Sequence, residues 1–287
     1  MKSGGQKVVV PVRMSGQRLA LKILWLTASS ESPPPPTEDA TENEPKEQEV
    51  AARTRREVGI ISGAHIPELV KLGPISLTKG NMGGESVLYY AEEWVEGRDV
   101  KTVIREDGPL PPAAIARLGI EMSRAIEWLW DRKTIHRDIK PGNIMRRDDG
   151  GFVLLDMGMA LDLGDVSLTA PGLAVGTLPY LSPEQLDTPK KRSMDFRSDM
   201  YSLGVTMYEA ATGKHPYYRN GMSSTDTIIG IQSERPKDPC QVRAGFPEEL
   251  SDVIMRLLEK QPHLRYRTCS KLQDELRPMS TSVGVLG

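Results

Sequence analysis

Four polar residues near the middle of the chain have the types and the spacing that phosphoryl transfer requires. They are Asp138, Lys140, Asn143 and Asp156. The carboxylate of Asp138 can orient an attacking hydroxyl and accept its proton, and Lys140 can neutralise the transferring oxygens from the same loop. Mg²⁺ takes oxygen ligands, so the amide of Asn143 and the carboxylate of Asp156 suit it. The group therefore predicts a phosphoryl-transfer site built on positioning and charge neutralisation.

The segment between the two metal-ligand candidates has the pattern of a β-hairpin. Residues 143–145 and 152–155 read as two strands, and the intervening D-D-G-G at 148–151 is a strong turn signal. A hairpin here would return Asp156 to the neighbourhood of Asn143, so both ligands could share one metal ion.

At this point the chain resembles the eukaryotic-type protein kinases. Residues 136–143, H-R-D-I-K-P-G-N, resemble their catalytic loop, and D-M-G at 156–158 resembles their D-F-G triplet. The resemblance implies that Asp138 is the catalytic base, that Lys140 marks the serine/threonine branch, and that the two ligand candidates hold Mg²⁺. An H-R-D triplet alone fits an ordinary charged surface loop, so the inference rests on the whole block.

Composition limits the other classes of function. A length of 287 residues allows a large core and two lobes with a cleft between them. The formal net charge of -2 provides no basic field for nucleic acid. Two cysteines, Cys240 and Cys269, make no disulfide framework and fit a reducing compartment.

The sequence shows neither the pattern of a transmembrane helix nor that of a signal peptide. No apolar run approaches the roughly 18 residues that a transmembrane helix needs. The N-terminus lacks the charge, apolar run and cleavage site of a signal peptide. These patterns predict a cytoplasmic protein.

A lysine in an apolar strand is the next candidate for function. Residues 7–13 and 17–26 read as two strands joined at 14–16, and Lys22 lies inside the second. A buried ammonium group needs an anionic partner, whereas a lysine on an edge strand could point to solvent. The resemblance implies that Lys22 contacts the α- and β-phosphates of ATP and a glutamate on a helix.

The expected partner of this lysine lies on a helix predicted over residues 53–63. Glu57 is the first candidate on that helix, and Glu49 is the alternative. A plain surface glutamate remains an open interpretation for either residue.

The glycine-rich loop of the family is incomplete in this sequence. Only Gly4 and Gly5 occupy the region where G-x-G-x-x-G would cover the nucleotide phosphates. Either the chain lacks its true N-terminus or its phosphate cover is reduced. Loss of the strand ahead of these glycines would leave a sheet edge exposed.

Residues 28–51 differ sharply from their surroundings in composition. They begin with a proline run at 33–36 and continue with an excess of acidic residues. Low hydrophobicity with net negative charge predicts a disordered insert. A polyproline II docking segment is the alternative interpretation of the proline run.

The strand predicted over residues 87–95 precedes a hinge at Glu96. The resemblance implies that backbone groups of Glu93 and Val95 pair with adenine. In this register Glu92 would face the back of the adenine pocket, which is an unusual place for a charge.

Two helices after the hinge have clear signals. After prolines 111 and 112, apolar residues recur at spacings of three and four: Ile115, Leu118, Met122, Ile126 and Leu129. A later helix is predicted from Ser198, as N-cap, to Gly213. The resemblance implies that Asp199 hydrogen-bonds the catalytic-loop backbone.

The resemblance also assigns roles to the segment 159–182 and to one distant ion pair. Within the segment, Ser167 and Thr169 are candidate phosphorylation sites, and Arg137 is the candidate partner of such a phosphate. The closing G-T-L-P-Y-L-S-P-E resembles bacterial serine/threonine kinases and implies that Thr177 lies beside the catalytic residues. Glu184 is expected to pair with Arg265 in a structural ion pair.

These observations predict an α+β protein with the two-lobed protein kinase fold. Residues 1–96 would form the small β-rich lobe, 97–278 the helical lobe and 279–287 a tail. The first functional hypothesis is an ATP- and Mg²⁺-dependent serine/threonine kinase that acts on protein substrates. A pseudokinase that binds nucleotide or partners without efficient transfer is the second, and a kinase-like small-molecule phosphotransferase is the third.

Overall fold

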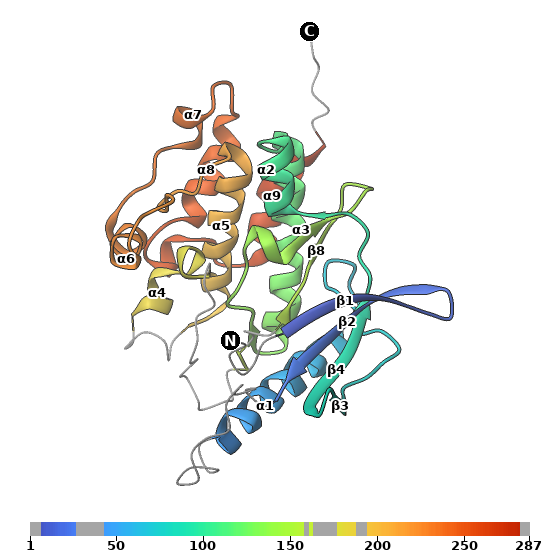
Figure 1. Ribbon diagram of the computed structural model, residues 1–287. Coiled ribbons are helices and arrows are strands. Elements are labelled where there is room, and N and C mark those ends of the chain that lie inside the picture. The colour runs from blue at the N-terminus through green and yellow to red at the C-terminus, as the bar shows by residue number, and fades with distance from the viewer. Residues whose placement is uncertain (1–6, 27–42, 158–160, 163–176, 188–193, 282–287) are drawn as a thin grey trace. The chain divides into compact units, whose positions relative to one another are not determined.

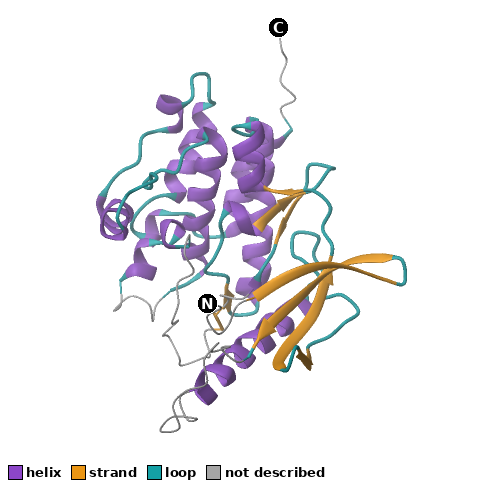
Figure 2. Ribbon diagram, viewed as in Figure 1, coloured by secondary structure: helices purple, strands orange, loops and turns teal. Residues whose placement is uncertain are grey.

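The computed structural model describes residues 7–26, 43–157, 161–162, 177–187 and 194–281. The chain divides into two compact units. One holds the residues up to Val95 with Asp156–Gly158, and the other holds Glu96–Leu155 and Met159–Gly287. Figure 2 shows that the longest strands belong to the first unit and that helices dominate the second. The predicted α+β class is confirmed.

A four-stranded antiparallel sheet is the main β-structure of the described first unit (Figure 1). Its strands, in the spatial order β1-β2-β4-β3, are β1 (Lys7–Met14), β2 (Gln17–Trp25), β4 (Glu85–Glu93) and β3 (Thr78–Met82). Lys22 of β2 pairs with Val9 of β1 on one side and with Tyr90 of β4 on the other. Lys22 is therefore on an inner strand, and it is buried.

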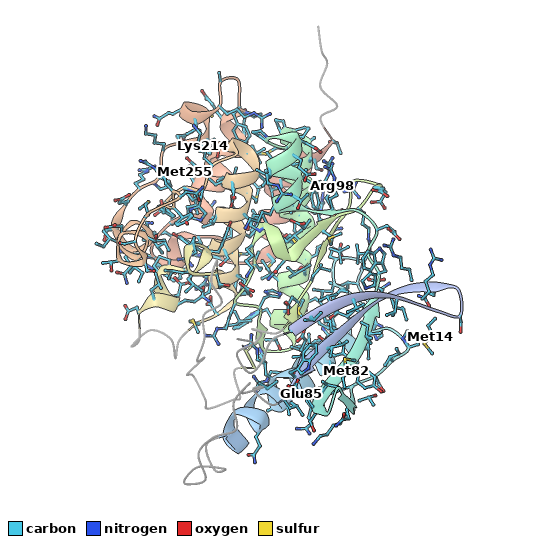
Figure 3. All side chains as sticks on the ribbon, in the orientation of Figure 1. Met14, Met82, Glu85, Arg98, Lys214 and Met255 are labelled. Atoms are coloured by element: carbon cyan, nitrogen blue, oxygen red, sulfur yellow. The ribbon has the colours of Figure 1, made fainter. Side chains whose placement is uncertain are left out.

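Strand β1 lies at the edge of the described sheet. Its side chains Val8, Val9 and Val10 are exposed, and Pro11 interrupts its row of N–H donors, as is usual only at sheet edges. Met14, labelled in Figure 3, lies at the turn into β2, at the opposite end of β1 from Lys7. Within the described residues, β1 is therefore an exposed edge strand.

The helix of the first unit is longer than the sequence predicted. Helix α1 spans Asn43–Ser62, so the prediction of disorder was wrong for residues 43–51. Glu, Lys and Gln are good helix formers, and a proline at position 45 is tolerated in the first turn. The composition of this stretch is typical of disorder, but its helix propensity and the buried side of α1 favour a helix. Residues 28–42 lie outside the described residues.

Helices make up most of the second unit. They are α2 (Val100–Asp107), α3 (Pro112–Asp131), α4 (Pro183–Leu186), α5 (Phe196–Thr212), α6 (Ser224–Ser233), α7 (Pro239–Val242), α8 (Glu248–Leu257) and α9 (Cys269–Ser280). The short strands are β5 (Arg98–Asp99), β6 (Thr134–Ile135), β7 (Ile144–Arg146), β8 (Phe152–Leu154) and β9 (Leu161–Asp162). Single 3-10 turns are η1 (Pro141–Asn143), η3 (Leu178–Tyr180) and η5 (Pro262–Leu264). Across the residues described, no helix has the length and apolarity to cross a bilayer.

Helix α3 is central to the core of the second unit. It starts at Pro112, and the predicted apolar stripe is buried: Ile115, Leu118, Met122, Ile126 and Leu129. A Cβ on Gly119 would lie 2.5 Å from Leu276 of α9 and 2.9 Å from Met207 of α5. Because only glycine leaves room for both neighbours, α3 packs closely against α5 and α9, as Figure 1 shows.

Helix α5 starts earlier than the sequence predicted. Its N-cap is Asp195, whose Oδ1 accepts a hydrogen bond from Arg197 N at 2.8 Å, so the prediction of Ser198 was wrong. Ser198 Oγ instead donates to Glu184 Oε1 at 2.8 Å. The end was predicted correctly, since Gly213 adopts a left-handed φ of 70° and closes the helix.

Gly97 permits a close backbone approach at the start of the second unit. Its φ is +133°, and a Cβ there would lie 2.1 Å from Arg146 O. Any other residue would have to push apart the pairing of β5 with β7, which begins at Arg98 (Figure 3).

His215 is a partly buried titratable group just after α5. Its Nδ1 accepts hydrogen bonds from the backbone N–H groups of Tyr217 and Tyr218, at 3.1 and 2.9 Å. Its ring also meets the ring of Tyr180 edge-on, with centroids 5.1 Å apart. Burial lowers the pKa of His215 from 6.5 to about 3. The folded state therefore keeps this imidazole neutral.

Replacing His215 with asparagine is expected to make stability less dependent on pH below about 6.5. The unfolded chain protonates this histidine below 6.5, whereas the folded chain does so only near 3. The unfolded state thus binds more protons between these values, and wild-type stability falls as pH falls, by at most about 1.4 kcal/mol per pH unit. Asparagine keeps an acceptor for the two N–H groups but binds no proton.

Urea unfolding at several pH values between about 7.5 and 5 measures this effect. A difference in the free energy of unfolding that is the same at every pH reports lost packing. A difference that changes as pH falls reports the protonation of His215 in the unfolded state. The exposed His263, replaced by asparagine, serves as the control. Parallel pH curves for the wild type and the His215 variant would contradict the prediction.

Candidate active site

Asp138 lies at the centre of a hydrogen-bonded cluster in the second unit. Its carboxylate accepts hydrogen bonds from Lys140 Nζ at 2.8 and 2.9 Å, and from Thr177 Oγ1 at 3.1 Å. Asn143 Nδ2 donates to Asp138 Oδ2 at 2.8 Å and to the Asp138 carbonyl at 2.9 Å. Lys140 Nζ also donates to Thr177 Oγ1 at 2.9 Å. The structure therefore brings these four side chains together.

Asp199 of α5 holds the backbone that carries this cluster. Its two carboxylate oxygens accept hydrogen bonds from His136 N and Arg137 N, each at 2.8 Å. Arg137 has a φ of +68°, a conformation that costs energy for a residue with a Cβ. Burial raises the pKa of Asp199, and the charge of His136 and the two N–H groups oppose that shift. The fixed carboxylate thus stabilises a strained loop just before Asp138.

The predicted hairpin is present in the second unit. Strands β7 and β8 pair with Ile144 opposite Leu154, and Gly150 makes the turn with a φ of +81°. Leu155 N donates to Asn143 O at 2.8 Å, so the strand ends beside the start of its partner. The next residue, Asp156, is grouped with the first unit and has a left-handed φ of +58°. A metal ion shared by Asn143 and Asp156 stays a prediction.

Lys22 in the first unit bonds to two buried carboxylates. Its Nζ donates to Glu57 Oε1 at 3.2 Å and makes a short hydrogen bond to Glu92 Oε1. Glu57 was the first candidate partner, and the side chain of the alternative, Glu49, lies outside the described part. Sequence reasoning noticed the unusual charge of Glu92 but did not assign it to Lys22.

Lys7 is a member of this group that sequence reasoning missed. Its Nζ donates to Glu57 Oε1 at 2.8 Å and to Asp156 Oδ1 at 2.7 Å. Its position in the strand is the signal that could have found it, because Lys7 lies two residues before Val9, which pairs with Lys22. Alternate residues of a strand face the same side of the sheet, but using that rule requires the register.

The charges of this group shift one another. Burial alone lowers the pKa of Lys22, but the carboxylates of Glu92 and Glu57 outweigh it and raise the pKa above its ordinary value. Burial raises the pKa of Glu92, and the ammonium group of Lys22 opposes this shift. Lys22 is therefore held as a cation inside the unit.

The two residues expected to contact a base lie at the end of the first unit. Glu93 ends β4, and its backbone N–H donates to Lys71 O at 2.9 Å. Its carbonyl is therefore the backbone group to consider for a base. Val95 is the last residue before the chain enters the second unit.

Glu184 and Arg265 form a buried ion pair in the second unit. Arg265 Nη1 and Nη2 donate to the two oxygens of Glu184 at 2.6 and 2.9 Å. Burial acts to raise the pKa of Glu184, but the Arg265 guanidinium holds it below its usual value. Arg265 also donates to three backbone carbonyls, those of Arg197, Glu259 and Lys260. The pair joins α4 to the segment that precedes α9.

Some predicted site residues lie outside the described residues. They are Gly4, Gly5, Ser167 and Thr169. Their predicted roles in phosphate binding and phosphorylation stay predictions. Arg137 is described, and its assignment as the partner of a phosphate stays a prediction as well.

The side chains present fit Mg²⁺ by their chemistry. Asn143 uses its amide nitrogen for Asp138, so its carbonyl oxygen would be the ligand atom, and Asp156 would supply a carboxylate. Both are hard oxygen ligands, and Mg²⁺ commonly takes one or two protein ligands together with waters and phosphate oxygens. Lys7 already contacts the Asp156 carboxylate, so a metal ion would share that group with an ammonium.

The second unit is helical, follows a β-rich unit, and holds an Asp–Lys–Asn–Thr cluster on a loop that a buried aspartate supports. This combination defines a protein kinase domain. The comparison with known families agrees, since residues 39–276 match the protein kinase domain. The chain belongs to this family, and the predicted resemblance and two-lobed kinase fold are confirmed. The match begins after β1 and β2, so it does not include Lys7 or Lys22.

Similar proteins are bacterial serine/threonine kinases by name. A probable serine/threonine-protein kinase of Clostridium perfringens is 30% identical over 83% of this chain and 33% of its own length. Serine/threonine-protein kinase PknB of Mycobacterium leprae is 31% identical over 78% of this chain and 35% of its own. A probable PknB of Corynebacterium glutamicum is 32% identical over 82% and 36%. The chain thus spans about a third of the length of these relatives.

Proposed function

We propose that this protein is an ATP- and Mg²⁺-dependent kinase that phosphorylates serine and threonine hydroxyls of protein substrates. The observation that supports this most is the convergence of Lys140, Asn143 and Thr177 on the carboxylate of Asp138. Such a cluster has a base, a cation and an amide in one place, as phosphoryl transfer requires. The names of the similar bacterial proteins point the same way.

In this proposal Asp138 acts on the substrate hydroxyl. It orients the hydroxyl and accepts its proton while the oxygen forms a bond to the γ-phosphorus and the bond to the β,γ-bridging oxygen breaks, leaving ADP. Lys140 neutralises the transferring oxygens, and Thr177 fixes the positions of both side chains. Asn143 and Asp156 hold Mg²⁺, which neutralises phosphate charge when bound.

The remaining roles follow the same proposal. Lys22, oriented by Glu57, contacts the nucleotide phosphates, and the backbones of Glu93 and Val95 contact adenine. Gly4 and Gly5 contribute to the cover over the nucleotide phosphates. Phosphorylation of Ser167 or Thr169 would regulate activity through Arg137, because a phosphate group forms charge-assisted hydrogen bonds with an arginine. We also propose the cytoplasm as the place of action, because two cysteines without a disulfide framework suit a reducing compartment.

A nucleotide-binding pseudokinase is the second candidate, and one observation favours it. Lys22 makes its short hydrogen bond to the buried Glu92, a carboxylate that would compete with phosphate for the same ammonium group. If that competition is strong, the protein would bind ATP but would transfer its γ-phosphoryl group poorly.

Removing the metal ion is expected to abolish transfer and thereby to test the proposed function. The wild-type protein is incubated with labelled ATP and a generic basic protein, and label on Ser and Thr of either protein is measured. Transfer should occur with Mg²⁺ and disappear when EDTA is added, because phosphate charge is then left without its counter-ion. Excess Mg²⁺ added back should restore it. ATP binding without transfer under any of these conditions would support the pseudokinase instead.

A further inference from the structure

Five ionisable side chains of the first unit form one connected network. It contains two lysines and three carboxylates: Lys7, Lys22, Glu57, Glu92 and Asp156. Glu57 Oε1 joins the two lysines, because it accepts a hydrogen bond from each. The side chains of Lys22 and Glu92 are 6% and 3% exposed, whereas those of Lys7 and Asp156 are 21% and 39% exposed. The network thus has a buried end and an open end.

The two lysines lie on the same face of the sheet. Val9 pairs with Lys22 across β1 and β2, and Lys7 lies two residues from Val9. Because side chains alternate along a strand, Lys7 and Lys22 project to one side, and both reach the same oxygen of Glu57. Lys7 is therefore placed to act on whatever anion approaches this face from solvent.

Lys22 has little capacity for another anion. An ammonium group has three N–H donors, and Lys22 gives hydrogen bonds to Glu57 and Glu92, which are both buried. Leaving either carboxylate unpaired in the interior is costly. Lys7 differs, because Glu57 would keep Lys22 as its partner and the partly exposed Asp156 could be solvated.

We propose that Lys7 is a second phosphate-binding cation, which binds the phosphate groups of a nucleoside triphosphate while Lys22 chiefly neutralises Glu57 and Glu92. The inference rests on the proposed function for the identity of the anion. Lys7 belongs to the open end of the network and can exchange its hydrogen bond to Asp156 for one to phosphate. In this division of roles, the contact of Lys22 with phosphate is secondary to its pairing with Glu57 and Glu92, whereas Lys7 is the principal phosphate-binding lysine.

Replacing Lys7 with methionine tests this division. ATP binding is expected to weaken about tenfold or more through loss of a charge-assisted hydrogen bond, while adenosine, which has no phosphate, binds as before. The melting temperature of the nucleotide-free protein should stay near that of the wild type. Lys7→Arg should retain most of the ATP affinity, since it keeps the charge. Equilibrium binding of ATP and adenosine and thermal unfolding provide these readouts.

Two further variants serve as comparisons. Lys22→Met is expected to lower the melting temperature of the nucleotide-free protein, because Glu92 then loses its cation. Lys79→Met removes an exposed lysine from β3 of the same sheet and should leave ATP binding unchanged. Together these variants separate a loss of phosphate binding from a general loss of positive charge or of stability.

Equal ATP affinity of the wild type and Lys7→Met would overturn the inference, as would a parallel loss of adenosine binding. Failure of the proposed function is a distinguishable result. A wild type that binds ATP through Lys7 but transfers no phosphoryl group contradicts the transferase alone. A wild type that transfers the group, with a KM for ATP unchanged in Lys7→Met, contradicts the Lys7 assignment alone. A wild type that binds no ATP contradicts both.

Discussion

Asp138→Asn is expected to reduce the rate of phosphoryl transfer by about 100- to 10,000-fold. Asparagine keeps the size of the side chain and one acceptor oxygen, but it cannot accept the substrate proton at neutral pH. Its amide would also meet Lys140 Nζ or Asn143 Nδ2, which both donate to the carboxylate in the wild type. The variant should therefore bind ATP but transfer the γ-phosphoryl group slowly, so kcat falls far more than KM changes.

The matched control for this prediction is Asp148→Asn. Asp148 is an exposed carboxylate in the turn of the same hairpin, and its replacement makes the same change of charge. We expect this variant to retain wild-type transfer. Labelled transfer to Ser and Thr, together with thermal unfolding, checks both proteins. Equal activity of Asp138→Asn and the wild type, with both folded, would show that Asp138 is not the base.

Arg265→Met is expected to destabilise the protein by about 3–5 kcal/mol. The Arg265 side chain has 0% exposure and makes a two-point contact with Glu184. Methionine leaves a buried carboxylate without its cation and three backbone carbonyls without a donor. A loss of stability of this size lowers the melting temperature by roughly 6–20 °C in a domain of about 150–250 residues.

The matched control is Arg277→Met, which removes an arginine from an exposed pair with Asp274. Exposed ion pairs contribute little, so we expect a change within about 1 kcal/mol. The double variant Glu184→Leu with Arg265→Met should recover part of the stability, because it leaves no unpaired charge. Thermal and urea unfolding measure all three. If Arg265→Met were no less stable than Arg277→Met, the buried pair would not have the assigned structural role.

The catalytic-loop cluster could be predicted because it is local. Asp138, Lys140 and Asn143 lie within one short segment, so the course of a single loop determines their proximity. The hairpin that follows was also predictable, because D-D-G-G allows the tight turn that Gly150 makes with a positive φ. Placement of Thr177 beside this loop required the family resemblance, since 37 residues separate it from Lys140.

The start of α1 was less predictable from composition. An acidic, polar stretch fits a disordered insert and a solvated helix equally well, because neither buries apolar surface along that stretch. The helix is held at its other end, where Thr54, Glu57 and Ile61 are buried. Contacts made by residues later in the chain therefore decided the state of residues 43–51.

By itself, the sequence determined the chemistry of the loop, the class of the fold and the need of Lys22 for an anionic partner. Only the tertiary structure decided that Lys22 contacts Glu92 as well as Glu57, and that Lys7 joins them through Glu57 and Asp156. The physical reason is that residue types and short spacings specify local geometry. Partners on different strands depend on sheet register, and a shift of one residue in a strand would turn Lys7, Lys22 or Glu92 to the opposite face.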